Sequence, residues 1–178
     1  MVIKGDGFLL RSCQLSDKMA LLKHANNKNI SDNLRDRFPH PYTEQDAEWF
    51  VNFLLENNSP VTNFIIEIDH EAAGCISFWK GEDVYRLNAE IGYWLGQEHW
   101  GKGVMTRVIK LMVHYIFKYF DIKRIYAMPF AINIGSVRVL EKAGFTKEAT
   151  IHNGVIKNGQ MLDYYIYSIT SFGSETGM

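Results

Sequence analysis

Apolar residues follow two spacings along the chain, and the longest regular stretch runs from Val104 to Tyr119. Apolar side chains recur there at steps of three and four, which predicts an amphipathic helix. The positions concerned are Val104, Val108, Leu111, Met112, Tyr115, Ile116 and Tyr119. Shorter helices are predicted after Ser16-Asp17, after the capping segment at Thr43, and over residues 133–143 before Gly144.

Strands are predicted where apolar runs are bounded by turn residues, namely over residues 8–13, 64–68, 72–79, 87–95, 123–128, 145–152 and 161–170. Asn153-Gly154 and Asn158-Gly159 are both turn signals between the last two strands. The polar stretch 26–37 is predicted as a loop or a frayed helix. The pattern indicates one mixed α+β domain over residues 1–172, with a largely antiparallel sheet and a loose tail over residues 173–178.

Composition narrows the class of protein. The chain has 178 residues, of which 47% are hydrophobic and 22% charged, so it is neither wholly disordered nor fibrous. A net charge of -1 argues against a protein that coats nucleic acid. Cys13 and Cys75 are expected to be buried thiols. With no signal-peptide pattern and no long apolar stretch, we expect a cytoplasmic protein without a membrane or nucleic-acid partner.

The six histidines lie in separate predicted elements and show no metal-ligand spacing. No metal site is therefore expected from the sequence.

The segment Gly101-Lys102-Gly103 stands where a strand ends and the longest helix begins. Glycines there let the backbone approach a ligand, and free amides at the helix start can hold an anion such as a pyrophosphate. A simple tight turn explains the same glycines equally well. The pattern matches neither a P-loop nor a dinucleotide-binding fingerprint.

A second polar pair, Asn133 and Ser136, lies one turn apart at the start of the helix over residues 133–143. Ser136 alone is more simply interpreted as a helix cap. Its place one helix and one strand after the glycine turn would let both elements border the same cleft.

With these blocks in view, the sequence resembles the GNAT superfamily of acetyl-CoA-dependent N-acetyltransferases, and within it the RimJ/RimL-type branch. The resemblance extends from Phe8 to Thr170. It rests on ordered blocks: Leu10-Arg11 with Asp17, Pro41-Tyr42-Thr43 with Asp46-Ala47 and Trp49, residues 89–96, residues 100–106, and residues 133–145.

The resemblance implies a GNAT-like fold, with a mixed, mostly antiparallel central sheet flanked by helices, and acetyl-CoA as the cofactor. The pantetheine arm would lie against Trp94 and Leu95, where neighbouring strands splay apart. Asn133 would reach the cofactor by its side chain, and Arg138 would approach it too. The pyrophosphate would meet backbone amides of Gly101, Lys102, Gly103, Val104, Met105 and Thr106.

Two departures from the family pattern stand out. Trp100 and Met105 replace the usual first and last residues of the glycine turn, which the RimJ/RimL branch tolerates. Leu140 stands where many members carry a tyrosine that protonates the departing thiolate. Since leucine cannot donate a proton, Ser136 is the substitute that the resemblance implies.

Amide formation needs a neutral amine, so a nearby carboxylate would help to remove the amine's proton. Glu90 is the candidate base, because its strand projects Glu90, Gly92 and Trp94 on one face. An exposed or ion-paired Glu90 is the alternative. Backbone amides near Leu95 are candidates for polarising the thioester carbonyl.

Together these features predict an N-acetyltransferase in which a primary amine attacks the acetyl thioester directly in a ternary complex. The branch suggests the α-amino group of a protein N-terminus, such as that of a ribosomal protein, as acceptor. A small amine, such as a polyamine, an amino acid or an aminoglycoside-like compound, stays open as acceptor. So does a non-catalytic acyl-CoA sensor. The sequence is compatible with a monomer or a homodimer.

Overall fold

The computed structural model describes residues 1–57 and 60–171. They fall into two compact units: the first holds Met1–Ser77 and Tyr93–Val108, and the second holds Phe78–Gly92 and the chain from Ile109 onward. The expectation of one domain over residues 1–172 stays a prediction. Residue 172 and the predicted loose tail, residues 173–178, lie outside the described residues.

The described strands form a mixed sheet with the order β1-β2-β3-β4-β5-β6-β8-β7. Its strands are β1 (Val2–Gly5), β2 (Phe8–Arg11), β3 (Asn63–Ile68), β4 (Glu71–Lys80), β5 (Asn88–Leu95), β6 (Arg124–Ala127), β7 (Thr146–Lys157) and β8 (Gln160–Thr170). β5 and β6 are parallel, whereas β1–β2, β2–β3, β3–β4, β6–β8 and β7–β8 are antiparallel. The predicted mixed, mostly antiparallel sheet is therefore confirmed.

The helices of the described chain are α1 (Lys18–Ala25), α2 (Lys28–Ser31), α3 (Glu44–Glu56), α4 (Val104–Tyr119) and α5 (Ile134–Lys142). Short 3-10 turns are η1 (Leu15–Asp17), η2 (Asp83–Tyr85) and η3 (Gln97–His99). None of the described helices is long and apolar enough to span a membrane.

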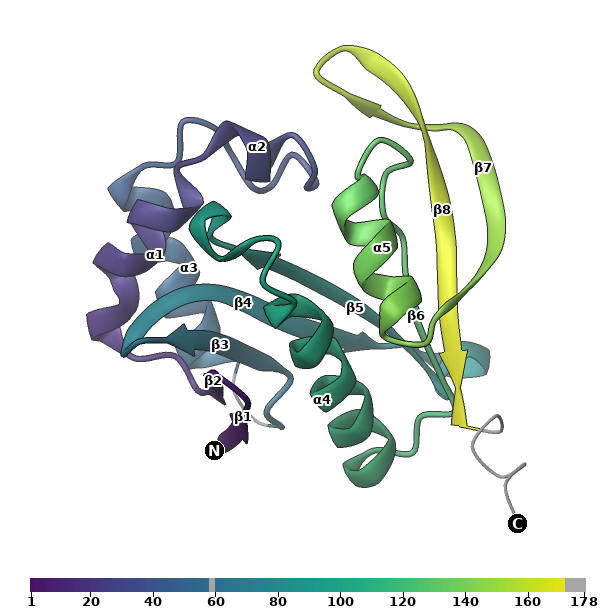
Figure 1. The fold of residues 1–178 in the computed structure, drawn as a ribbon, viewed down its shortest axis with the longest axis horizontal. Helices are drawn as coiled ribbons and strands as arrows, with labels where there is room; N and C mark the ends of the chain where they lie inside the picture. Colours follow the sequence, from purple (N-terminus) through teal and green to yellow (C-terminus); the bar gives the residue numbers. More distant parts are fainter. Residues whose placement is uncertain (58–59, 172–178) are drawn as a thin grey trace. The chain divides into compact units, whose positions relative to one another are not determined.

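In the first unit, α1 and α3 pack side by side (Figure 1). Thr43 caps the start of α3, as predicted. Its hydroxyl oxygen accepts a hydrogen bond from the Asp46 backbone amide, and the Asp46 carboxylate accepts one from the Thr43 backbone amide. The apolar faces of both helices contribute to one core, which includes Leu21, Ala25, Ala47, Val51, Leu54, Ile65 and Trp94.

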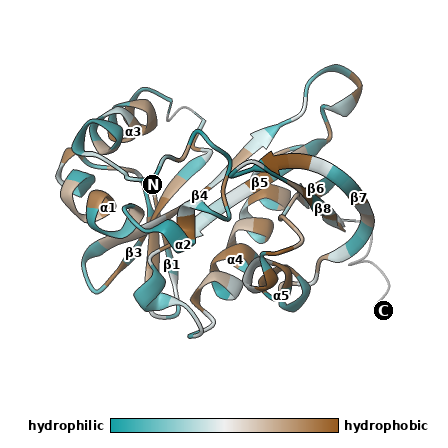
Figure 2. Ribbon diagram, turned by 90° about the horizontal axis from the view of Figure 1, so that it is seen from above, coloured by the Kyte–Doolittle hydropathy of each residue, from teal (hydrophilic) through white to brown (hydrophobic). Residues whose placement is uncertain are grey.

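In the second unit, β7 and β8 form a long hairpin (Figure 1), and three aromatic rings cluster in the core. Phe78 and Phe120 meet edge to face at 4.9 Å, and Tyr115 contacts both rings. Both apolar and polar residues occur along α4 (Figure 2), and the burial of Val108, Met112, Tyr115 and Ile116 confirms the predicted amphipathic helix, although Tyr119 at its end is 62% exposed.

Three local expectations were incomplete. The short edge strand β1 was missed, since it has no fully buried residue. Asn153-Gly154 does not end a strand but lies inside β7 at a shift of register, whereas the hairpin turns at Asn158-Gly159. The stretch 26–37 contains α2, and its Ile30 is buried rather than solvated.

Candidate functional site

The glycine turn before α4 has the backbone geometry of an anion-binding loop. Gly101 and Gly103 both adopt left-handed φ values, +73° and +71°, on either side of Lys102. All three residues are exposed, whereas Val104 and Met105 anchor the turn by buried side chains. Val104 and Met105 can therefore contact a ligand only through their backbone, and the turn stands where the first amides of a long helix have no partner within the helix.

The side chains of Arg107 and Trp100 hold this turn in place, a role that the sequence did not predict. The Arg107 guanidinium donates to the Lys102 carbonyl oxygen at 3.3 Å and to the Asp6 carbonyl oxygen at 3.2 Å. The Trp100 indole donates to the Leu95 carbonyl oxygen at 2.8 Å, which fastens the turn to the end of β5. Trp100, a departure from the family pattern, therefore has a structural role.

The end of β5 presents its backbone rather than its side chains. Trp94 is 8% exposed and meets Phe38 edge to face at 5.5 Å, so its ring belongs to the core. β5 pairs with β6 through Asn88, Ala89 and Glu90, and it extends beyond the last of these pairs to Leu95. A pantetheine contact at Trp94 would therefore have to use main-chain groups.

One candidate oxyanion donor near Leu95 is excluded by its existing bond. The Gly96 amide donates to the Ala73 carbonyl oxygen at 2.7 Å and is therefore already used. Gly74 beside it must lack a side chain, because a Cβ there would collide with the Trp94 carbonyl oxygen.

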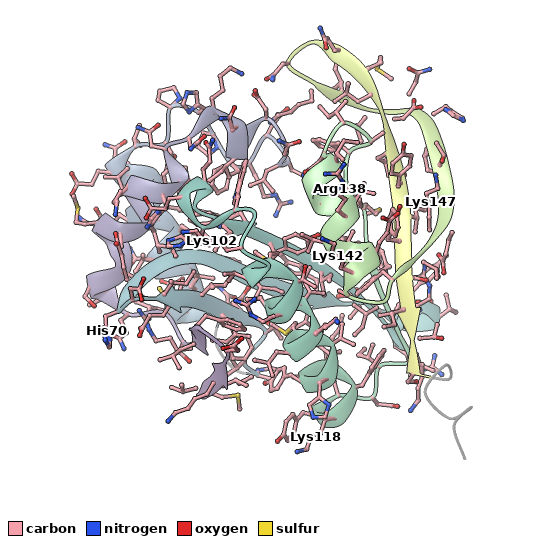
Figure 3. The ribbon with its side chains drawn as sticks, in the orientation of Figure 1. His70, Lys102, Lys118, Arg138, Lys142 and Lys147 are labelled. Atoms are coloured by element: carbon pink, nitrogen blue, oxygen red, sulfur yellow. The ribbon has the colours of Figure 1, made fainter. Side chains whose placement is uncertain are left out.

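At the start of α5, the cap is Asn133 and not Ser136. The Asn133 Oδ1 atom accepts the Ser136 amide at 3.0 Å, which corrects the interpretation of Ser136 as the capping side chain. Arg138 is exposed, and Figure 3 shows it on α5 one turn before Lys142. Capping occupies one acceptor position of Asn133 Oδ1 and leaves the side-chain nitrogen available as a donor to a cofactor.

Glu90 is half-buried in the middle of β5 and is the partner of Tyr126 in the parallel register. Arg124, two residues before Tyr126, stacks on the Tyr126 ring at 5.0 Å and bonds to the Asn88 side chain. Since residues two apart share a face of a strand, Glu90 has these polar groups as neighbours. These neighbours are compatible with Glu90 as a general base and equally with Glu90 as part of a structural network of polar side chains.

The Trp79 side chain is 48% exposed. A Cβ on Gly92 would come within 2.8 Å of the Trp79 ring, so the indole lies over Gly92. Gly92 shares a face of β5 with Glu90, and Trp79 therefore adds an aromatic surface next to the candidate base. Only the structure shows this contact, because the two residues belong to different strands.

Leu140 is fully buried in the second unit. Its side chain therefore fills core volume at the position where many family members carry the tyrosine acid. A proton donor must come from elsewhere, as the sequence comparison with the family pattern implied.

Both cysteines are free and buried, as predicted. Burial is the main cause that raises the pKa of each thiol to about 12. Since the thiolate is the reactive form, we expect native protein to react with a thiol reagent far more slowly than protein unfolded in denaturant. Rapid labelling of two thiols per native chain would contradict this assignment.

Two solved structures that superpose closely on this chain are acetyltransferases. An acetyltransferase of the GNAT family from Bacillus anthracis superposes with a TM-score of 0.83 at 25% identity, over 96% of this chain and 98% of that one. RimL, a ribosomal L7/L12 α-N-protein acetyltransferase solved with coenzyme A, superposes with a TM-score of 0.84 at 22% identity, over 96% of this chain and 98% of that one. The chain therefore has the fold of these acetyltransferases.

Residues 8–146 match the family model described as the acetyltransferase (GNAT) domain, so the chain belongs to the GNAT family of N-acetyltransferases. The family binds acetyl-CoA, and the predicted enzyme class and cofactor are thereby confirmed.

Sequence relatives differ in the acceptors that their names state. The "Probable N-acetyltransferase YjcK" of Bacillus subtilis is 44% identical over 101 residues, 57% of this chain and 56% of that protein, so the match spans little more than half of either. The ribosomal-protein-serine acetyltransferase of Escherichia coli is 27% identical over 71% of each chain. The spermidine N(1)-acetyltransferase of the same species is 30% identical over 54% of this chain and 52% of that one.

Proposed function

We propose that this N-acetyltransferase acetylates the α-amino group of a protein N-terminus, and that the turn from Gly101 to Thr106 holds the cofactor. The observation that carries the cofactor part of this proposal is the pair of exposed glycines with left-handed φ values just before α4. Backbone amides in such a turn at the start of a helix suit the pyrophosphate of acetyl-CoA. Asn133, through its side-chain nitrogen, and the exposed Arg138 are proposed as further contacts.

Acetyl-CoA supplies the activated acetyl thioester when it is bound. Glu90 takes a proton from the acceptor ammonium group, directly or through water, so that a neutral nitrogen forms the new N–C bond. The new N–C bond would form as the C–S bond breaks, and the Ser136 hydroxyl would give a proton to the departing sulfur. The second proton that the nitrogen loses on becoming an amide would return to Ser136 through water. These roles rest on the strand face of Glu90, the place of Ser136 on α5, and the burial of Leu140.

A protein N-terminus is favoured as acceptor because the E. coli ribosomal-protein-serine acetyltransferase matches over more of its length than the spermidine enzyme does, 71% against 52%. A polyamine is the second candidate, supported by the higher identity of the spermidine enzyme, 30% against 27%.

A panel of acceptors distinguishes these proposals. Release of CoA is measured with a peptide that has a free N-terminal serine, with the same peptide blocked at its N-terminus, and with spermidine. We expect turnover with the free peptide only. Turnover with spermidine alone would establish the small-amine alternative, and tight acetyl-CoA binding without turnover of any amine would indicate the sensor.

The role of the turn has its own prediction. Gly101→Val should weaken acetyl-CoA binding by about tenfold or more, because a β-branched residue at positive φ costs roughly 1–3 kcal/mol and displaces the amides. The measurement is a calorimetric titration with acetyl-CoA. Gly159→Val is a matched control: its φ is +74°, and neither glycine has an atom within 4 Å of an added Cβ. Equal loss of affinity in both variants would contradict the assignment.

A further inference from the structure

His24, on the last turn of α1, is a buried histidine with an unsatisfied nitrogen. Its side chain is 4% exposed, and Nε2 is the one buried side-chain nitrogen or oxygen of the described residues that has no hydrogen-bond partner. The ring is fixed in place, because it packs against the backbone of Gly96 so closely that a Cβ there would meet it. Leaving such an atom unsatisfied costs roughly 1–3 kcal/mol, so the position requires an explanation.

The side chains around this nitrogen are typical metal ligands. His24, Glu98 and His99 each offer a ligand atom, and these atoms all lie within 4.8 Å of one another. The Glu98 Oε1 atom lies 3.9 Å from His24 Nε2 and 3.4 Å from His99 Nε2. In a tetrahedral site with bonds of about 2.0–2.1 Å, neighbouring ligand atoms are roughly 3.4 Å apart. The three groups are therefore already close to a ligating arrangement.

Pairing with Glu71 does not explain the unsatisfied Nε2 atom of His24 as well as a metal ion does. Glu71 Oε1 lies 3.4 Å from His24 Nε2, but no hydrogen bond forms between them. Glu71 is instead bound by the Lys23 ammonium group at 2.8 Å. Burial lowers the pKa of His24, which favours the neutral imidazole that a metal ion requires.

We propose that His24, Glu98 and His99 bind one divalent transition-metal ion of the Zn²⁺ type. Two imidazoles and one carboxylate suit Zn²⁺ or Co²⁺, whereas Mg²⁺ and Ca²⁺ prefer oxygen ligands alone. Glu71 lies beside this cluster as a second carboxylate. The Lys23 ammonium group, 3.9 Å from Glu98, is a cation that would compete with the metal ion for this carboxylate. The metal would join the end of α1 to η3, the segment immediately before the glycine turn, and would stabilise both.

The test is binding of Co²⁺ and Zn²⁺ alone to the full chain, followed by Co²⁺ absorption and by competition with a chromophoric chelator. We expect one ion per chain, and a zinc-dependent rise in Tm. His99→Gln and Glu98→Gln should each weaken binding by at least about tenfold, because even residues outside the ligand shell cost 10–100-fold when changed. Both variants should also lose the zinc-dependent rise in Tm.

His152→Gln is the matched control, since His152 also pairs with a carboxylate, Asp163, at 2.8 Å but has no second imidazole in such a cluster. This variant should bind as the wild type does. Glu98 is 55% exposed, so Glu98→Gln decides the matter if His99→Gln fails to fold. Wild-type binding no tighter than that of Glu98→Gln, or equal loss in His152→Gln, would overturn the proposal.

Discussion

Replacing Asp17 by asparagine is expected to lower the free energy of unfolding by about 3–5 kcal/mol, the largest stability effect that we anticipate. Both Asp17 carboxylate oxygens accept from the Arg11 guanidinium, at 2.7 and 2.8 Å, and both residues are buried. The hydrogen bonding that Arg11 donates to Asp17 is the main cause that raises the pKa of Arg11. The variant therefore leaves a buried cation that still pairs with Glu67 but has lost its bidentate partner.

Urea-induced unfolding of the two proteins measures this loss. Glu44→Gln is the control, because Glu44 pairs with Lys18 at 2.7 Å but is 61% exposed, and removal of a surface pair costs no more than about 1 kcal/mol. If Asp17→Asn cost no more than Glu44→Gln, Arg11 and Asp17 would not be the buried structural pair that the geometry indicates.

Glu90→Gln is expected to lower kcat at pH 7 by about 10²–10⁴-fold, the usual contribution of a positioned general base. An acceptor α-amine has a pKa near 7.7–8.0. Above that range the amine is mostly neutral without help, so the deficit should shrink as the pH rises to about 9. The measurement is kcat for wild type and variant across this pH range, with a saturating peptide acceptor.

Glu82→Gln is a suitable control, because Glu82 is exposed in the same unit and has no proposed role in the reaction. A kcat for Glu90→Gln equal to that of wild type would place Glu90 in the structural network of Arg124 and Tyr126. A deficit that stays constant with pH would likewise exclude proton removal as its role.

The sequence predicted those features that depend on local chemistry. The helix α4, its amphipathic pattern and the cap at Thr43 follow from spacing within a few residues. The positive φ values of Gly101 and Gly103 also depend on local chemistry, because glycine is the residue that adopts such values at little cost. The family resemblance then supplied the use of the turn, which spacing alone left open.

Side-chain contacts that form only once the chain has folded could not be predicted in this way. The block of Arg11 and Asp17 contributed to the resemblance, but only the structure shows it as a buried ion pair. Trp79 lies over Gly92 from another strand, and Arg107 braces a turn several residues before it. None of these contacts leaves a periodic signal in the sequence.

The histidines show the same limit most plainly. His24 and His99 are far apart in the sequence and fit no metal-binding spacing, which is why no metal site was expected. The fold nevertheless places them next to Glu98, because α1 packs against the segment that follows β5. Metal ligands drawn from separate elements can be found only after the elements are placed.

The central claim is that backbone amides of the Gly101–Thr106 turn hold the pyrophosphate of acetyl-CoA. Calorimetric titration of the protein with S-acetyl 4′-phosphopantetheine, and in parallel with S-acetyl pantetheine, which differs only in lacking the phosphate group of the arm, tests it directly. Hydrogen bonds to a charged group contribute roughly 1.5–3 kcal/mol each, so the compound without the phosphate should bind at least about tenfold more weakly. Equal affinity for the two compounds, or no binding of acetyl-CoA by the folded protein, would contradict the claim.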